Sequence, residues 1–318
     1  MKIGPVRRRK ASDRRALNLG IRTACLLFAA AWQPAAAADS SYIFEPERVG
    51  WTRAELTASK YLLSMNASVA IEDVDLSSLD SLLLTPLTDE ERLQITVPLA
   101  LSYVTDGLGR LNENQLLLDG RLGLSIQRTS LRLGGSPKYR TYRFGQDEIL
   151  RLTRRPAESE QELPPEVWSR ISEEAYPYPG EESNPVVAEA GALIYLAAAS
   201  SLNQPGDRVD LLTLASDEFF IASLVVGSPN NTSVDYAMLR KGAGSRRTGR
   251  LAALSIAIEA RPLAAAPDEE FELFGLTDLE LLLDPETRAP LELRGHVDYF
   301  GHVAFRLQQL TLRRDTAD

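Results

Sequence analysis

The chain has 318 residues, of which 44% are hydrophobic and 25% charged, and its formal net charge is −9. This length can bury a sizeable core, and the composition is typical of a globular protein, which excludes a disordered or multi-span membrane protein. The acidic balance disfavours non-specific binding to nucleic acid or to anionic lipid head groups. We therefore expect no nucleic-acid partner.

Residues 1–38 have the pattern of a signal peptide. Eight Lys and Arg residues precede an apolar run from Ala24 to Trp32, and a series of small residues ends at Ala38. The run is too short to span a membrane, which takes roughly 20 residues. We expect cleavage near Ala38, a periplasmic location and no transmembrane span in the mature chain. Arg14-Arg15 fits a twin-arginine signal, but the residues that follow favour ordinary secretion.

The mature chain predicted in this way is strongly acidic and lacks cysteine. Cleavage leaves 27 Lys and Arg against 43 Asp and Glu, a net charge of −16, and removes Cys25, the only cysteine. No disulfide can then form, so the fold must depend on packing alone. We expect residues 39–318 to form a single β-rich domain.

The ordered part of the mature chain is expected to begin near Trp51, and alternating apolar residues after it predict strands in the first half. The predicted strands cover residues 61–71, 93–103, 115–118, 122–133 and 139–152. Asp119-Gly120 indicates a hairpin turn between two of them. Residues 73–84 fit either a helical turn or a loop.

The middle of the chain predicts the helices. A connector rich in Pro and Glu covers residues 155–185, with a short helix predicted from Pro165 to Ala175. Asn184 followed by Pro185 has the pattern of a helix start. The apolar residues up to Ser201 spread over more than one narrow face, which predicts one buried helix over about 185–201.

Strands are predicted again at 209–214, 219–226, 251–259, 276–283, 291–299 and 302–312. The last three are expected to form an antiparallel meander. The predicted fold class is therefore mainly β, with a curved antiparallel sheet or open half-barrel, one buried helix and a short Pro-rich helical connector.

The C-terminal half also carries a family resemblance. A strand ending at Asp284, a strand led by Pro290 and a final hairpin bearing Gly301 resemble the bacterial domain-of-unknown-function 3108 family. The likeness covers about residues 120–312 and matches residues 39–118 less clearly. It implies an exported envelope protein whose curved antiparallel sheet carries a helix across its concave side, as in periplasmic lipoprotein carriers. It implies no catalytic residues.

Motifs for catalysis or metal binding are absent from the sequence. Only two histidines, His296 and His302, occur, and Asp298 is expected to face His302 across the final hairpin. A metal site wants three or four converging ligands, so we expect no metal and no cofactor. There is no Gly-x-Ser-x-Gly run and no phosphate loop. Carboxylate pairs such as Asp217-Glu218 are typical of solvated surface, and no catalytic residue is predicted.

Two groups of residues are candidates for binding. A face for an apolar ligand is expected from Leu254, Ile256, Leu281, Leu283, Val303 and Phe305, for which ordinary core is the alternative. A basic loop that docks an unknown envelope partner is expected from Arg240, Lys241, Arg246, Arg247 and Arg250, for which a solvated hairpin tip is the alternative.

The function expected from the sequence is a non-enzymatic binding or interaction protein of the cell envelope. The alternatives are a carrier of an apolar ligand, similar to lipid or lipoprotein carriers, and an envelope hydrolase. A third is a structural role in assembly, which is favoured if the buried helix fills the concave face of the sheet. An open apolar face or a deep cleft lined with polar groups would distinguish these possibilities.

Overall fold

The computed structural model of the protein describes residues 43–60, 63–107, 109–179, 187–215, 217–240, 242–264, 270–297 and 300–313. The predicted signal peptide lies outside the described residues. So do Lys241, Asp298 and the first two residues of the predicted helix over 185–201.

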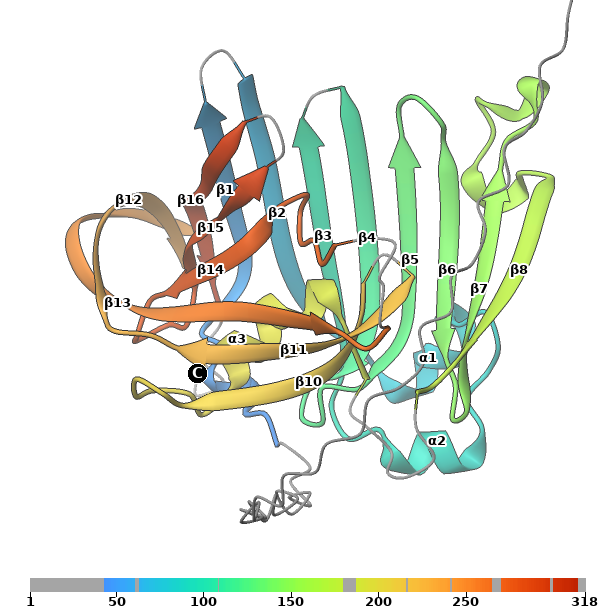
Figure 1. Ribbon diagram of the computed structural model, residues 1–318, viewed down its shortest axis with the longest axis horizontal. Helices are drawn as coiled ribbons and strands as arrows, with labels where there is room; N and C mark the ends of the chain where they lie inside the picture. The colour runs from blue at the N-terminus through green and yellow to red at the C-terminus, as the bar shows by residue number, and fades with distance from the viewer. Residues whose placement is uncertain are drawn as a thin grey trace, which may run out of the picture. The chain divides into compact units, whose positions relative to one another are not determined.

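The described residues form a mainly β structure, as predicted, with its strands in one continuous sheet (Figure 1). The first eight strands are β1 (Trp51–Lys60), β2 (Leu63–Asp73), β3 (Pro98–Gly107), β4 (Arg110–Asp119), β5 (Ser125–Leu133), β6 (Lys138–Phe144), β7 (Glu148–Arg155) and β8 (Arg170–Pro177). The next eight are β9 (Val187–Glu189), β10 (Arg208–Ala215), β11 (Glu218–Val226), β12 (Asn230–Arg240), β13 (Ala243–Pro262), β14 (Thr277–Leu283), β15 (Pro290–Val297) and β16 (Gly301–Leu312).

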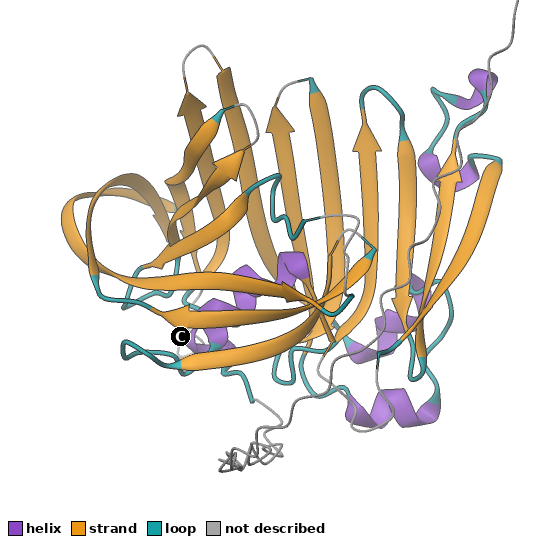
Figure 2. Ribbon diagram, in the orientation of Figure 1, coloured by secondary structure: helices purple, strands orange, loops and turns teal. Residues whose placement is uncertain are grey.

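Helices are few and short (Figure 2). The α-helices are α1 (Leu79–Leu82), α2 (Asp89–Gln94) and α3 (Leu193–Ala199). The 3₁₀ helices are η1 (Pro46–Arg48), η2 (Leu76–Ser78), η3 (Glu158–Glu160), η4 (Pro165–Val167) and η5 (Ala190–Ala192). Within the described ranges, no helix is both long and apolar enough to cross a membrane.

The sheet is built mainly from neighbouring antiparallel strands. Its order runs from β8 back to β1, continues through β16, β15, β14 and β13, and ends at β11, β10 and β9. The predicted C-terminal meander is confirmed by the pairing of β14 with β15 and of β15 with β16. β12 pairs with both β13 and β16, so β12 to β16 close into a ring.

The hydrophobic core lies between this ring, the crossing strands β10 and β11, and the inward side of β1 to β4. Figure 1 shows β10, β11 and β13 passing across the upright strands of the first half, with α3 beside them. Every side chain of α3 is buried, which confirms the prediction that the helix is buried. The apolar part of the sheet is therefore filled by the protein's own helix.

The helix predictions are wrong in their limits. Residues 187–189 form β9, which pairs in parallel with β10, and helical structure begins only at Ala190. The short helix predicted from Pro165 ends at Val167, and Arg170 to Pro177 form β8 against β7. In both places, pairing with a neighbouring strand wins over local helix propensity, which is a weak preference that tertiary contacts override.

Candidate functional site

The six residues expected to form an apolar ligand face do share one face, but it is core. Cross-strand pairs join Leu254 to Leu283 and Ile256 to Leu281. The side chains of Ile256, Leu281, Leu283 and Phe305 are fully buried, and Leu254 and Val303 pack against the same cluster. The closed ring and α3 cover this face, so the structure supports the alternative of ordinary core.

The expected basic docking loop is not a loop. Arg246, Arg247 and Arg250 lie within β13, and Arg240 ends β12. Arg247 points inward and pairs with the fully buried Asp284 at 2.6 Å, and Arg246 pairs with Asp235 at 2.7 Å. Glycines at 242, 244 and 249 suggest a flexible segment, but pairing with β12 keeps it extended. The cations thus do not form one loop surface, and Arg246 and Arg247 are engaged in ion pairs within the protein.

The histidines lie opposite each other in the final hairpin. His296 on β15 pairs with His302 on β16, and their ring centroids are 5.6 Å apart. The expected contact of His302 with Asp298 falls outside the described residues. No group of three or more His, Cys, Asp or Glu side chains converges on a metal position in the described part of the chain.

A polar surface covers part of the inner face of the sheet, which we define as the face on which Val69 and Tyr103 enter the core. Residues directly opposite each other in antiparallel strands point to the same face. Tyr103 on β3 pairs with Asn114 on β4. The pairing continues through one residue on each of the strands β5 to β8, and we call these four residues the middle row: Ser130, Arg140, Thr153 and Ser172. The inner face therefore changes from apolar to polar between β3 and β5.

Two residues further along each strand, the inner face carries four cations, which we call the cationic row: Arg132, Lys138, Arg155 and Arg170. Arg132 pairs with Lys138, and Arg155 pairs with Arg170. In the pairing of β6 with β7, Tyr139 lies opposite Arg154. Lys138 and Arg155 are one position further along, so they lie side by side. Within the described residues, none of the four forms a hydrogen bond or ion pair with an acid.

On the other side of the middle row, the deep row combines cations with acids. It consists of Arg128, Tyr142, Arg151 and Glu174. Arg128 pairs with the buried Glu189 at 2.8 Å, and its guanidinium lies over the Tyr142 ring, 5.1 Å from the centroid. Arg151 pairs with Glu174 and with Asp217. The arginines of the deep row therefore have their counter-charges within the protein, unlike those of the cationic row.

Asp217 reaches the inner face from the turn between β10 and β11, where its φ is 69°. Tyr142 donates to its carboxylate at 2.5 Å, and Arg140 lies 3.5 Å away. Burial acts to raise the pKa of Asp217, but the Tyr142 hydroxyl, Arg140 and Arg151 outweigh it and lower that pKa below its usual value. The expectation of a solvated surface carboxylate is therefore wrong for Asp217, which pairs with Arg140 and Arg151 of the inner face.

Several donors on the inner face have no partner. The Nε atoms of Arg128, Arg140 and Arg151 and the hydroxyl oxygen of Thr153 are buried and form no hydrogen bond within the described residues. Buried polar groups are nearly always hydrogen-bonded in native proteins. Four such atoms on three adjacent strands leave hydrogen-bonding capacity unused beneath this surface.

The cationic row is electrostatically strained. Partial burial, together with the neighbouring Arg140, Arg132 and Arg155, lowers the pKa of Lys138 to about 8, and Asp217 offsets this only in part. Like charges directly opposite each other destabilise a sheet. The row therefore reduces the stability of the free protein.

Replacing Lys138 with glutamine is expected to raise the free energy of unfolding by about 0.5–1 kcal/mol at pH 7, because it removes one repelling charge from a partly solvated row. Lys138 loses its proton near pH 8 when folded and near pH 10.5 when unfolded. The stability of the original protein should then rise with pH across that interval relative to the variant. Urea unfolding of both proteins from pH 7 to 10.5 measures both effects. If their free energies of unfolding change with pH in parallel, the electrostatic strain on Lys138 is contradicted.

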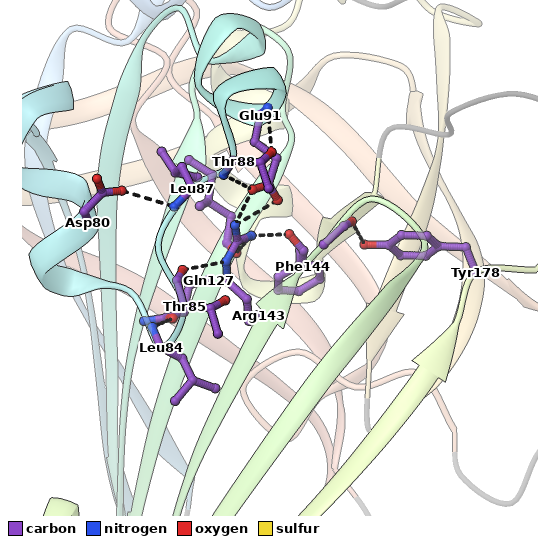
Figure 3. Close-up of polar contacts among 12 residues, drawn as sticks. Asp80, Leu84, Thr85, Leu87, Thr88, Glu91, Gln127, Arg143, Phe144 and Tyr178 are labelled. Atoms are coloured by element: carbon purple, nitrogen blue, oxygen red, sulfur yellow. Dashed lines mark hydrogen bonds and ion pairs between the residues drawn. The ribbon is translucent and has the colours of Figure 1, made fainter.

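A second feature is a cavity of about 320 Å³ between α2 and the end of β6. Arg143 is buried beside it, and both Glu91 carboxylate oxygens accept from its Nη2 at 2.8 Å (Figure 3). Its other donors bond three backbone carbonyls, so the guanidinium is fully used. The cavity is also lined by Glu90 and Asp147, so it has no excess positive charge. Its polar contacts fasten the α1–α2 segment to the sheet.

The sequence carries a signal for the cations of the inner face that lies outside any known motif. Cations or hydroxyls occupy alternate positions in 128–132, 138–142 and 151–155, three neighbouring segments of an acidic chain. In strands, alternate positions share a face, so the three segments place their cations together. Searching for catalytic motifs missed this pattern because it repeats across strands and not along one segment.

Comparison with known proteins identifies no relative, since no protein-family model, curated protein or solved structure matches the chain. The resemblance to the domain-of-unknown-function 3108 family therefore stays a prediction. The function has to be argued from the geometry and charge of the inner face.

Proposed function

We propose that this protein is an exported, non-enzymatic binding protein that holds an anionic ligand on the inner face of β5 to β8. The observation that carries the proposal is the cationic row. Its members, Arg132, Lys138, Arg155 and Arg170, lie on successive strands and lack an acid partner among the described residues.

An acidic chain has many carboxylates with which to neutralise such a row. It does so in the deep row, where Arg128 and Arg151 have Glu189, Asp217 and Glu174 as partners. Among the described residues, no acid forms an ion pair with the cationic row, although the repulsion within the row costs stability. An anion bound there would supply the charge and form charge-assisted hydrogen bonds, which are about twice as strong as neutral ones.

The alternatives from the sequence have less support. The apolar face that a lipid carrier needs is filled by the ring strands and α3. A hydrolase with a serine nucleophile needs a histidine base, but both histidines contact each other in the β15–β16 hairpin. The inner face offers guanidinium, ammonium, amide and hydroxyl groups, which are groups that bind an anion.

Replacing Arg132 and Lys138 together with glutamine is expected to weaken binding of pyrophosphate about 100-fold or more. Hydrogen bonds to charged groups contribute about 1.5–3 kcal/mol each, and about 1.4 kcal/mol is a tenfold change in affinity. Isothermal titration calorimetry of the purified protein at low ionic strength measures the change.

The matched control replaces Arg53 and Arg246 with glutamine. These two arginines are exposed, each has its own acid partner, and neither lies on the inner face of β5 to β8. The control removes the same charge, so it should bind pyrophosphate within about twofold of the original protein if the site is local. Equal losses in both variants, or no binding by the original protein, would overturn the proposal.

A further inference from the structure

We infer that the anionic ligand is an extended acidic oligosaccharide that lies across β4 to β8, with its carboxylates on the cationic row and its hydroxyls on the middle row. This inference rests on the proposed function and names the class of ligand. It is carried by the length of the cationic row and by the chemistry of the residues beside it.

The cationic row is too long for a single small anion. Neighbouring strands lie about 4.8 Å apart, so the row from Arg132 on β5 to Arg170 on β8 extends over about 14 Å. A phosphate or single carboxylate can contact one or two of these side chains. A single chain with regularly spaced negative charges can contact all of them and neutralise the whole row.

The residues beside the row discriminate between kinds of polyanion. The inner face also carries Asn112, Asn114, Ser130, Thr153 and Ser172, which are in register with the cations or one step away. Amides and hydroxyls both donate and accept hydrogen bonds. Sugar hydroxyls also do both, whereas a polyphosphate chain only accepts. This mixture of groups therefore fits a glycan better than a polyphosphate.

Thr153 gives this argument a specific atom. Its side chain is 3% exposed, and its hydroxyl has no partner within the described residues. It lies between Arg140 and Ser172 in the middle row. A polyphosphate has no donor for the oxygen of this hydroxyl, whereas a sugar hydroxyl can donate to it. Most side chains around it are only partly buried, and a ligand reaches this hydroxyl by displacing them.

The experiment titrates the purified protein with galacturonate, tri- and hexagalacturonate, and a polyphosphate matched in charge to the hexamer. Affinity is expected to rise at least tenfold from monomer to hexamer and to be higher for the hexamer than for the polyphosphate. In a variant with Ser130→Ala and Thr153→Val, which keeps every charge, hexagalacturonate should bind about tenfold more weakly. Polyphosphate, which can accept from these hydroxyls but not donate to them, should lose clearly less affinity.

The control variant, Ser102→Ala with Thr129→Val, removes one serine and one threonine hydroxyl from the opposite face of the sheet, on β3 and β5. It should bind both ligands as the original protein does. Tighter binding of polyphosphate, or no effect of the Ser130 and Thr153 changes, would overturn the glycan inference and leave the anion site standing. If no anion binds, the proposed function fails as well.

Discussion

Replacing Arg288 with methionine is expected to lower the free energy of unfolding by about 3–5 kcal/mol, because it leaves buried acceptors without a donor. The Arg288 side chain is buried and donates to the carbonyl oxygens of Ala198 at 3.1 Å, Ser200 at 2.9 Å and Leu202 at 3.0 Å. The Ala198 carbonyl lies in the last turn of α3, where an α-helix lacks intrahelical donors, and the Ser200 and Leu202 carbonyls lie in the segment that follows the helix. Urea unfolding of the variant measures the loss.

Two further variants make this result specific. Arg288→Lys keeps the charge but not the planar set of donors, so its free energy of unfolding should lie between those of the original protein and Arg288→Met. Arg53→Met removes an exposed arginine paired with Glu55 and should cost less than about 1 kcal/mol. A loss below about 1 kcal/mol for Arg288→Met would show that solvent or other donors satisfy the end of α3.

Replacing Glu189 with glutamine is expected to cost about 3 kcal/mol and to make the protein respond more strongly to added anion. Glu189 is buried, pairs with Arg128 at 2.8 Å, and accepts from Tyr103 at 2.9 Å and from the Gly191 amide at 2.7 Å. Without the carboxylate, Arg128 becomes a buried cation that has lost its ion-pair partner. Pyrophosphate should then raise the melting temperature more than it does in the original protein.

A double-mutant cycle with Arg128→Gln separates the ion pair from the rest of the site. If the pair accounts for the loss, the double variant should be more stable than the sum of the single losses predicts, by about 1.5 kcal/mol or more. Additive losses would assign the effect to the Tyr103 and Gly191 contacts. An unchanged response to pyrophosphate in Glu189→Gln would separate Arg128 from the proposed anion site.

Local patterns were sufficient to predict most strands. Alternation of Leu254, Ile256 and Ile258 with polar or small neighbours predicts the central part of β13, and the turn at Asp284-Pro285 predicts the β14–β15 connection. β12 was missed because its first four residues, from Asn230 to Ser233, are polar and its apolar residues begin only at Val234. Its pairing with β13 and β16, which lie far apart in the chain, keeps it extended.

The candidate site was only partly accessible to sequence reasoning. The alternation of Arg128, Ser130 and Arg132 places them on one face of a strand wherever that strand lies. The register between β5, β6 and β7 then decides that Arg132 lies beside Lys138 and that Arg140 lies beside Thr153. Register depends on turn lengths and on burial of the opposite ends of the strands, which no single segment contains.

The sequence by itself determined a mainly β chain with a short buried helix, because side-chain alternation and apolar clustering act over a few residues. Only the tertiary structure decided which faces are filled and which stay polar. The ring of β12 to β16 and α3 fill the face predicted to hold an apolar ligand. Asp217 comes from a distant turn to join the basic surface. Burial and charge pairing at these places depend on contacts between segments far apart in sequence, so they follow from the fold and not from local pattern.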